Sequence, residues 1–201
     1  QLGGRGPAAS GRWRMVQWVF GYGSLVWRAD FPYQARRLGY LQGWERVWWQ
    51  GSTDHRGTPE APGRTVTLHR KEGARVWGMA YQIGDADEAQ VLPQLEYREK
   101  QYDLRVRETV YSVDDAPIVQ DCLVYVATPK SANYLGPASL QELAQTIATA
   151  EGPSGPNHEY CLRLAEAMRS LGLVDEGLFE LEAEIRSILQ LAPAGSADNS
   201  S

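Results

Sequence analysis

Residues 19–27 read Val-Phe-Gly-Tyr-Gly-Ser-Leu-Val-Trp, an apolar run that stops in a turn with two glycines. The β-branched and aromatic residues predict a strand over 16–22. Glycine lets a backbone approach a ligand closely, and successive amides that face one way can bind an anion. The same pattern is typical of an ordinary strand-to-turn junction. From spacing alone, a ligand-binding turn and a plain turn therefore both remain open.

Nucleotide-binding motifs do not extend from this turn. A dinucleotide fingerprint that began at Gly21 and Gly23 would need its third glycine at Val26, and no ribose-binding strand-helix-strand unit follows. The chain also lacks the lysine-bearing phosphate loop. The sequence therefore excludes the common nucleotide-binding loops.

Further strand signals fill the first two thirds of the chain. They are short runs of β-branched or aromatic residues between Gly, Pro or Asp, at 45–50, 64–68, 75–81, 109–113 and 122–127. Their number and close spacing favour a single sheet that could close into a small barrel.

Helical spacing replaces these signals in the last third. Apolar residues recur every three or four positions over 140–147, 161–171 and 178–189, and Ser139 with Glu142 forms a capping box before the first run. An earlier helical patch covers about 87–100, where Pro93 either kinks the helix or begins its second part. Strands followed by helices predict an α+β fold.

The composition of the 201 residues bounds the domain organisation. With 43% hydrophobic residues the chain can bury one core, and we expect one domain over 15–190. Residues 1–14 lack an apolar pattern, so we expect a disordered N-terminal extension, whether native, a cloning remnant or a targeting segment. Residues 191–201 are small and polar and are expected to form a disordered tail.

Charge and cysteine usage bound the partners. The net charge of −5 argues against nucleic acid, and no apolar stretch is long enough to span a membrane. Cys122 and Cys161 are far apart, which suits a reducing compartment and excludes a cysteine-rich metal site. We therefore expect a cytoplasmic protein without nucleic acid or membrane partners. We also expect a monomer or weak homodimer, although neither charge nor cysteine usage determines this.

Two polar segments are candidate sites. Residues 96–103 place Glu99 among aromatic rings, where burial could raise its pKa and suit it to acid-base catalysis, although such a run is also typical of a solvated face. The loop 50–59 is longer and more polar than a hairpin needs, which favours a binding loop. A triad within this loop, from Ser52, Asp54 and His55, is disfavoured because such close neighbours cannot align.

The remaining candidates are histidines and stiff turns. None of the histidines at 55, 69 and 158 has a partner at metal-ligand spacing, so no metal site is expected. The turns 134–138 and 152–157 bracket the first C-terminal helix. Such turns either only aim helices or shape a pocket wall that contains Tyr160.

Taken together, seven ordered blocks resemble the ChaC family of glutathione-specific γ-glutamylcyclotransferases, with a plant-like variant after residue 100. The blocks are 19–27, 30–33, 50–57, 63–68, 98–100, 134–138 and 152–157. The resemblance covers about 15–190. It implies the γ-glutamylcyclotransferase fold, a small mixed β-barrel with flanking helices. It also implies a cofactor-free cytosolic enzyme that converts glutathione to 5-oxoproline and cysteinylglycine.

The resemblance also implies roles for particular residues. The catalytic glutamate of the family falls on Glu99, and Tyr160 matches a tyrosine at the substrate. The turn that would hold the γ-glutamyl group falls on Tyr22, Gly23, Ser24 and Leu25.

The substrate carboxylates would be met by backbone amides or by one of three arginines, Arg56, Arg64 or Arg98. Animal members have glycines after the lysine, where this chain reads Gln101-Tyr102-Asp103, which leaves the mobility of that loop open.

Two other readings remain open at this stage. The chain could cyclise other γ-glutamyl amino acids or amines, or it could bind a γ-glutamyl peptide without catalysis. A carboxylate at position 99 argues against the second reading, because its loss would be the simplest route to an inactive relative.

Overall fold

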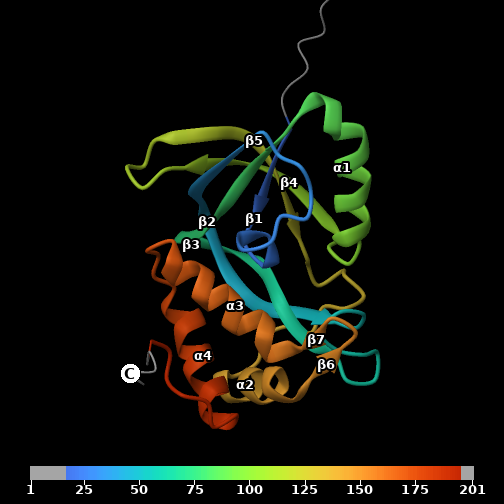
Figure 1. Cartoon of the computed structure of the whole chain (residues 1–201), viewed down its shortest axis with the longest axis vertical. Helices are drawn as coiled ribbons and strands as arrows, with labels where there is room; N and C mark the ends of the chain where they lie inside the picture. Colours follow the sequence, from blue (N-terminus) through green and yellow to red (C-terminus); the bar gives the residue numbers. More distant parts are fainter. Residues whose placement is uncertain (1–16, 196–201) are drawn as a thin grey trace, which may run out of the picture.

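Two long strands form the frame of the protein, whose computed structural model describes residues 17–195. The strands β2 (Ala35–Ser52) and β3 (Gly63–Ile83) pair antiparallel along almost their whole length. Register shifts between Gln42 and Trp44, and between Val47 and Gln50, mark irregularities in the ladder. Such bulges bend strands, so the pair can both curve around a barrel and extend past it to the helices (Figure 1).

Three shorter strands complete a closed barrel in the order β1-β3-β2-β4-β5. They are β1 (Gln17–Gly21), β4 (Leu104–Tyr111) and β5 (Pro117–Val126). Closure comes from a parallel pairing of β1 with β5, with Val19 opposite Leu123. Alternate residues of the strands fill the interior, including Phe20, Leu41 and Val110. The expected α+β barrel is therefore confirmed.

Helices cover two parts of this barrel. Helix α1 (Asp85–Arg98) lies along one side, and α2 (Leu140–Thr149), α3 (Asn157–Ser170) and α4 (Glu176–Ile188) gather against the far ends of β2 and β3 (Figure 1). Apolar residues of the last three helices join the barrel core in one cluster, in which Cys161 and Cys122 are both buried.

The helices match the expected ranges more closely than the strands do. The capping box of Ser139 and Glu142 is present, and α1 continues through Pro93 as one helix. The segments 64–68 and 75–81, expected as two strands, are parts of β3, and 45–50 is only the last third of β2. The error has a physical reason: residues 69–73 are exposed, so the apolar alternation stops, and pairing with β2 skips 71–74, although the extended backbone of β3 continues.

The remaining expectations concern the two chain ends, a metal site and membrane-spanning helices. The proposed extension 1–14 and the end of the proposed tail, 196–201, lie outside the described residues. Over 17–195, no group of His, Cys, Asp and Glu has the arrangement of a metal site. No helix in the same range is long and apolar enough to cross a membrane.

Asn157 fastens α3 to the barrel. Its side chain is fully buried, its Oδ1 accepts a hydrogen bond from the Arg64 backbone N–H at 2.6 Å, and its Nδ2 donates to the Arg64 carbonyl at 2.9 Å. The amide thus pairs with β3 as a neighbouring strand would. The tiny hairpin of β6 (Glu151–Gly152) and β7 (Gly155–Pro156) leads the chain into this contact.

We expect Asn157→Ala to lower the free energy of unfolding by about 2 to 4 kcal/mol, because it leaves a buried N–H and a buried carbonyl without partners. Ser139→Ala, which removes an exposed helix cap, should cost only about 1 kcal/mol. Denaturant titration of both variants checks this. Equal losses in the two variants would contradict the role of Asn157.

Candidate active site

A cavity of about 320 Å³ opens where the β1 turn, the loop after β2, the end of α1 and the start of α3 meet. A smaller recess of about 40 Å³ adjoins it beside the turn 20–25. Four residues line both spaces: Ser24, Glu99, Tyr102 and Tyr160. The structure thus brings the expected catalytic glutamate, the expected turn and the expected tyrosine together.

Glu99 ends α1 and turns its carboxylate into the cavity. Its backbone N–H donates to the Leu95 carbonyl at 2.8 Å, and its side chain is only 15% exposed. Burial raises the pKa of this carboxyl, and the positive charges of Arg98 and Arg105 partly oppose the rise. Arg98 is close, with its Nε 3.3 Å from Glu99 Oε1. A carboxyl whose pKa is raised toward neutrality can both accept and return a proton.

Tyrosines surround the recess. The Tyr22 hydroxyl donates to the Tyr125 carbonyl at 2.5 Å, and the Tyr102 hydroxyl donates to the Val66 carbonyl at 2.9 Å. Burial, and then the nearby charge of Glu99, raises the pKa values of Tyr22 and Tyr160. These phenols therefore stay neutral at physiological pH.

The turn after β1 is held from both sides. It enters a short 3-10 helix, Ser24–Val26, in which the Val26 N–H donates to the Gly23 carbonyl at 2.9 Å. The Tyr81 hydroxyl donates to the Leu25 carbonyl at 2.6 Å. The N–H groups of Ser24 and Leu25 open this helix, and the first N–H groups of a helix have no partner within it.

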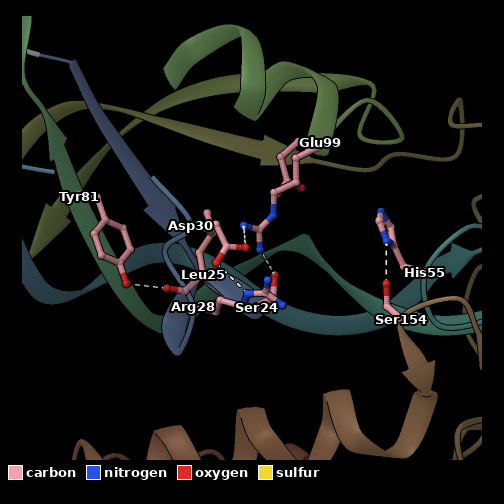
Figure 2. A network of polar contacts seen from close by, with 9 residues as sticks. Ser24, Leu25, Arg28, Asp30, His55, Tyr81, Glu99 and Ser154 are labelled. Carbon is pink, nitrogen blue, oxygen red and sulfur yellow. Dashed lines mark hydrogen bonds and ion pairs between the residues drawn. The ribbon is translucent and has the colours of Figure 1, made fainter. Parts of the chain in front are cut away.

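Arg98 connects this turn to Glu99. Its Nη2 donates to Ser24 Oγ at 2.5 Å, and its Nη1 lies 3.5 Å from Asp30 Oδ2. Figure 2 shows Ser24 and Asp30, from the connection between β1 and β2, on the same side as Glu99, which follows α1. One guanidinium therefore fixes the distance between the turn and the carboxylate.

Gly23 is required by a close approach rather than by its backbone angles. A Cβ at this position would lie 2.5 Å from Tyr160 Oη and 2.9 Å from Val66 Cγ2. Both distances are below ordinary contact, so a side chain at this position would push the Tyr160 ring or Val66 aside. Glycine thus allows the turn and α3 to approach this closely.

The loop after Glu99 is anchored, which bears on the mobility left open above. The Gln101 carbonyl accepts hydrogen bonds from Gln50 Nε2 at 3.2 Å and Ser131 Oγ at 2.8 Å. The side-chain Nε2 of Gln101 donates to Asp54 Oδ1 at 2.7 Å. Three separate segments therefore hold the residues that follow the glutamate.

The three arginine candidates do not all lie at the cavity. Arg56 and Arg98 line the cavity, but Arg64 does not. The Arg64 guanidinium donates to the carbonyls of Trp48 at 3.1 Å and Gly136 at 2.6 Å, so it braces the turn 134–138 instead. Arg64 is therefore not placed to bind a substrate carboxylate in this cavity.

The disfavoured triad is not assembled. Ser52 Oγ accepts a hydrogen bond from the Arg56 backbone N–H at 2.9 Å, and His55 Nδ1 lies 3.2 Å from Ser154 Oγ instead (Figure 2).

Sequence reasoning gave no role to several residues of the cavity wall, among them Tyr102 and Arg163. Tyr102 lies within a mixed-charge segment, and only its place beside Glu99 could have marked it. Arg163 is typical of a solvated helix face, although its spacing of three residues from Tyr160 puts both on one side of α3.

The fold and this site define a barrel protein with an acid-base cavity, and the chain belongs to the family described as ChaC-like protein, whose sequence model matches residues 17–188. It is 45% identical over 181 residues to Gamma-glutamylcyclotransferase 2-3 of Arabidopsis thaliana, which covers 87% of this chain and 91% of the relative. It is 43% identical over 178 residues to Glutathione-specific gamma-glutamylcyclotransferase 1 of Danio rerio, covering 86% and 90%.

A solved structure agrees. The crystal structure of the selenomethionine-labelled γ-glutamyl cyclotransferase specific to glutathione from yeast aligns with a TM-score of 0.77 at 25% identity, covering 85% of this chain and 96% of that one. The family and the fold expected from the seven sequence blocks are both confirmed.

The raised pKa of Glu99 has a consequence for stability. The folded protein holds this proton more tightly than the unfolded chain, so ionised Glu99 lowers the free energy of unfolding as pH rises above the ordinary carboxyl value of 4.5. We expect Glu99→Gln to be more stable than the unmodified protein at pH 7, with the difference shrinking toward pH 4.5. Denaturant titration across this range measures it.

A control of opposite sign lies one turn earlier on α1. Hydrogen bonds from Arg105 lower the pKa of Glu96, so Glu96→Gln should lose stability at pH 7 and recover as pH falls. If Glu99→Gln behaves like Glu96→Gln, the buried-carboxylate description of Glu99 is wrong.

Proposed function

We propose that this protein is an enzyme that degrades glutathione by intramolecular cyclisation, releasing 5-oxoproline and cysteinylglycine. The observation that carries the proposal is the buried Glu99 carboxylate, which faces the glycine turn across a recess at the end of a peptide-sized cavity. The names of the relatives support glutathione as the substrate.

The chemistry needs one group that moves a proton twice. The free α-amine of the γ-glutamyl moiety attacks its own γ-carbonyl, which closes a five-membered lactam and breaks the bond to the cysteine nitrogen. The attacking amine must lose a proton, and the leaving nitrogen must gain one. Glu99 accepts the first proton and returns it to the second nitrogen, so no water is consumed and the carboxylate is regenerated.

The turn supplies position and charge stabilisation. The γ-glutamyl group lies along Tyr22, Gly23, Ser24 and Leu25, with Tyr160 closing the opposite side. The N–H groups of Ser24 and Leu25 stabilise the oxyanion that develops on the γ-carbonyl. Arg98, already hydrogen bonded to Ser24, binds the α-carboxylate, and Arg56 adds positive charge further out. Binding the γ-glutamyl group in a folded-back conformation also brings its α-amine close to its γ-carbonyl, which lowers the entropic part of the barrier.

Two other readings predict different results. A cyclotransferase for other γ-glutamyl amino acids or amines would turn over those compounds faster than glutathione. A non-catalytic module would bind glutathione and release nothing. The buried carboxylate favours catalysis, because a binding module gains nothing from the cost of burying that charge.

The setting of the activity is also a proposal. We propose that residues 15–190 form the catalytic domain and that 1–14 and 191–201 are dispensable for it. We propose further that the protein works in the cytoplasm as a monomer or weak homodimer.

Incubation with reduced glutathione tests the reaction, with products measured by mass spectrometry. We expect 5-oxoproline and cysteinylglycine in equal amounts, and we expect Glu99→Gln to lower kcat by about 100-fold or more, because it removes the proton carrier. Glutathione binding to this variant, measured by calorimetry, should persist. Undiminished turnover by Glu99→Gln would rule out its role.

Gly23→Ala tests the turn. The added methyl must displace the Tyr160 ring, so we expect kcat/KM for glutathione to fall about 100-fold. Gly177→Ala is the matched control, since a Cβ there comes no closer than 4.0 Å to its nearest neighbour. Full activity of Gly23→Ala would show that the turn does not hold the reacting group.

A further inference from the structure

The outer cavity carries more positive charge than the proposed cyclisation uses. Four arginines line it, Arg28, Arg56, Arg98 and Arg163, against the carboxylates of Asp30 and Glu99. The whole chain has a net charge of −5, so this is a local reversal of sign. Such a cavity attracts a ligand with more than one carboxylate.

Three of these arginines are already committed to protein acceptors. Arg28 Nε donates to Asp30 at 2.7 Å, and Arg98 is held by Ser24. Arg56 is only 11% exposed, and its Nη1 donates to the Pro156 carbonyl at 3.0 Å and to Glu159 Oε2 at 3.1 Å. These groups shape the wall, and each of them already donates at least one hydrogen bond to the protein.

Arg163 differs from the other three. Its side chain is 51% exposed, and its ion pair with Glu159 spans 3.8 Å, which is too long for a hydrogen bond. The carboxylate of Glu159 lies nearer to Arg56 than to Arg163, so it orients the Arg163 guanidinium without occupying its donors. Arg163 therefore keeps its fork of N–H groups for a ligand.

The position of Arg163 fits one end of the peptide. Tyr160 lines both the recess and the outer cavity, whereas Arg163, three residues later on α3, lines only the outer cavity. Three residues of helix rise about 4.5 Å, and the arginine side chain adds its own length. Two extended residues beyond the γ-carbonyl span about 7 Å. A terminal carboxylate two residues from the reacting bond thus reaches the level of Arg163.

We propose that Arg163 binds the C-terminal carboxylate of the substrate. It thereby selects substrates whose γ-glutamyl group is joined to a dipeptide, as in glutathione, over those whose γ-glutamyl group is joined to a single amino acid. This inference rests on the proposed function and names the specificity determinant of the same site. Glu159 is the positioning residue for Arg163. The terminal carboxylate does not change during cyclisation, so the contact contributes equally to substrate and transition state and acts on KM rather than kcat.

The test compares glutathione with its neutral analogue, in which the glycine carboxylate is an amide. We expect the unmodified protein to prefer glutathione by about tenfold in kcat/KM, as a charged hydrogen bond of this kind supplies. In Arg163→Gln, KM for glutathione should rise about tenfold while turnover of the amide stays within about twofold. The preference should therefore disappear.

Two controls isolate the contact. Arg107→Gln is matched in exposure and in its long ion pair, since Arg107 is 46% exposed and lies 3.7 Å from Asp121, and Arg107 does not line the cavity. It should keep the full preference. An equal loss on both substrates in Arg163→Gln, or a preference erased by Arg28→Gln instead, would overturn the inference.

Binding separates this inference from the proposed function. The same two peptides are titrated by calorimetry into Glu99→Gln and into Glu99→Gln/Arg163→Gln. If the unmodified protein turns over neither peptide, the proposed reaction fails, yet a Kd ratio of about ten that disappears with Arg163→Gln still supports the contact. Equal Kd values for the two peptides in Glu99→Gln, or binding of neither, overturn it.

Discussion

The burial of one negative charge is the constraint on which the rest of the site depends. Burial away from water raises the pKa of the Glu99 carboxyl, and an unpaired buried carboxylate would lower the free energy of unfolding by several kcal/mol. Arg98 offsets part of that cost from 3.3 Å away. Because the same guanidinium binds Ser24 and Asp30, the group that stabilises the charge also places the turn opposite it.

The barrel and helix α3 contribute different parts of the site. The barrel provides the turn after β1 and the carbonyls that accept hydrogen bonds from Tyr22 and Tyr102, and α3 provides Tyr160 and Arg163 of the outer wall. Their relative position is set by the Asn157 amide on β3 and by the contact of Tyr160 with Gly23. Both are close contacts, and together they orient α3 on the barrel.

Much of the fold could be predicted from the sequence, for reasons that also explain the failures. Helical periodicity and the capping box at Ser139 are local signals, and they predicted α2 to α4 well. The exposed stretch 69–73 hid the continuity of β3, because the extended backbone continues there without an apolar alternation. The arginine candidates were ambiguous because sequence does not show where a guanidinium points. Arg64 and Arg98 were both candidates, and only the tertiary structure turns one toward Gly136 and the other toward the cavity.

The parallel pairing of β1 with β5 also determines when in folding the site can exist. The β2–β3 hairpin needs only neighbouring residues, but Val19 must find Leu123, and the Tyr22 hydroxyl must find the carbonyl of Tyr125, 103 residues away. Contacts between such distant residues form slowly and late, because their loop-closure entropy is lost before the contacts reward it. A nascent or partly folded chain can therefore hold most of its secondary structure and still have no recess. The site is therefore assembled only when the barrel closes.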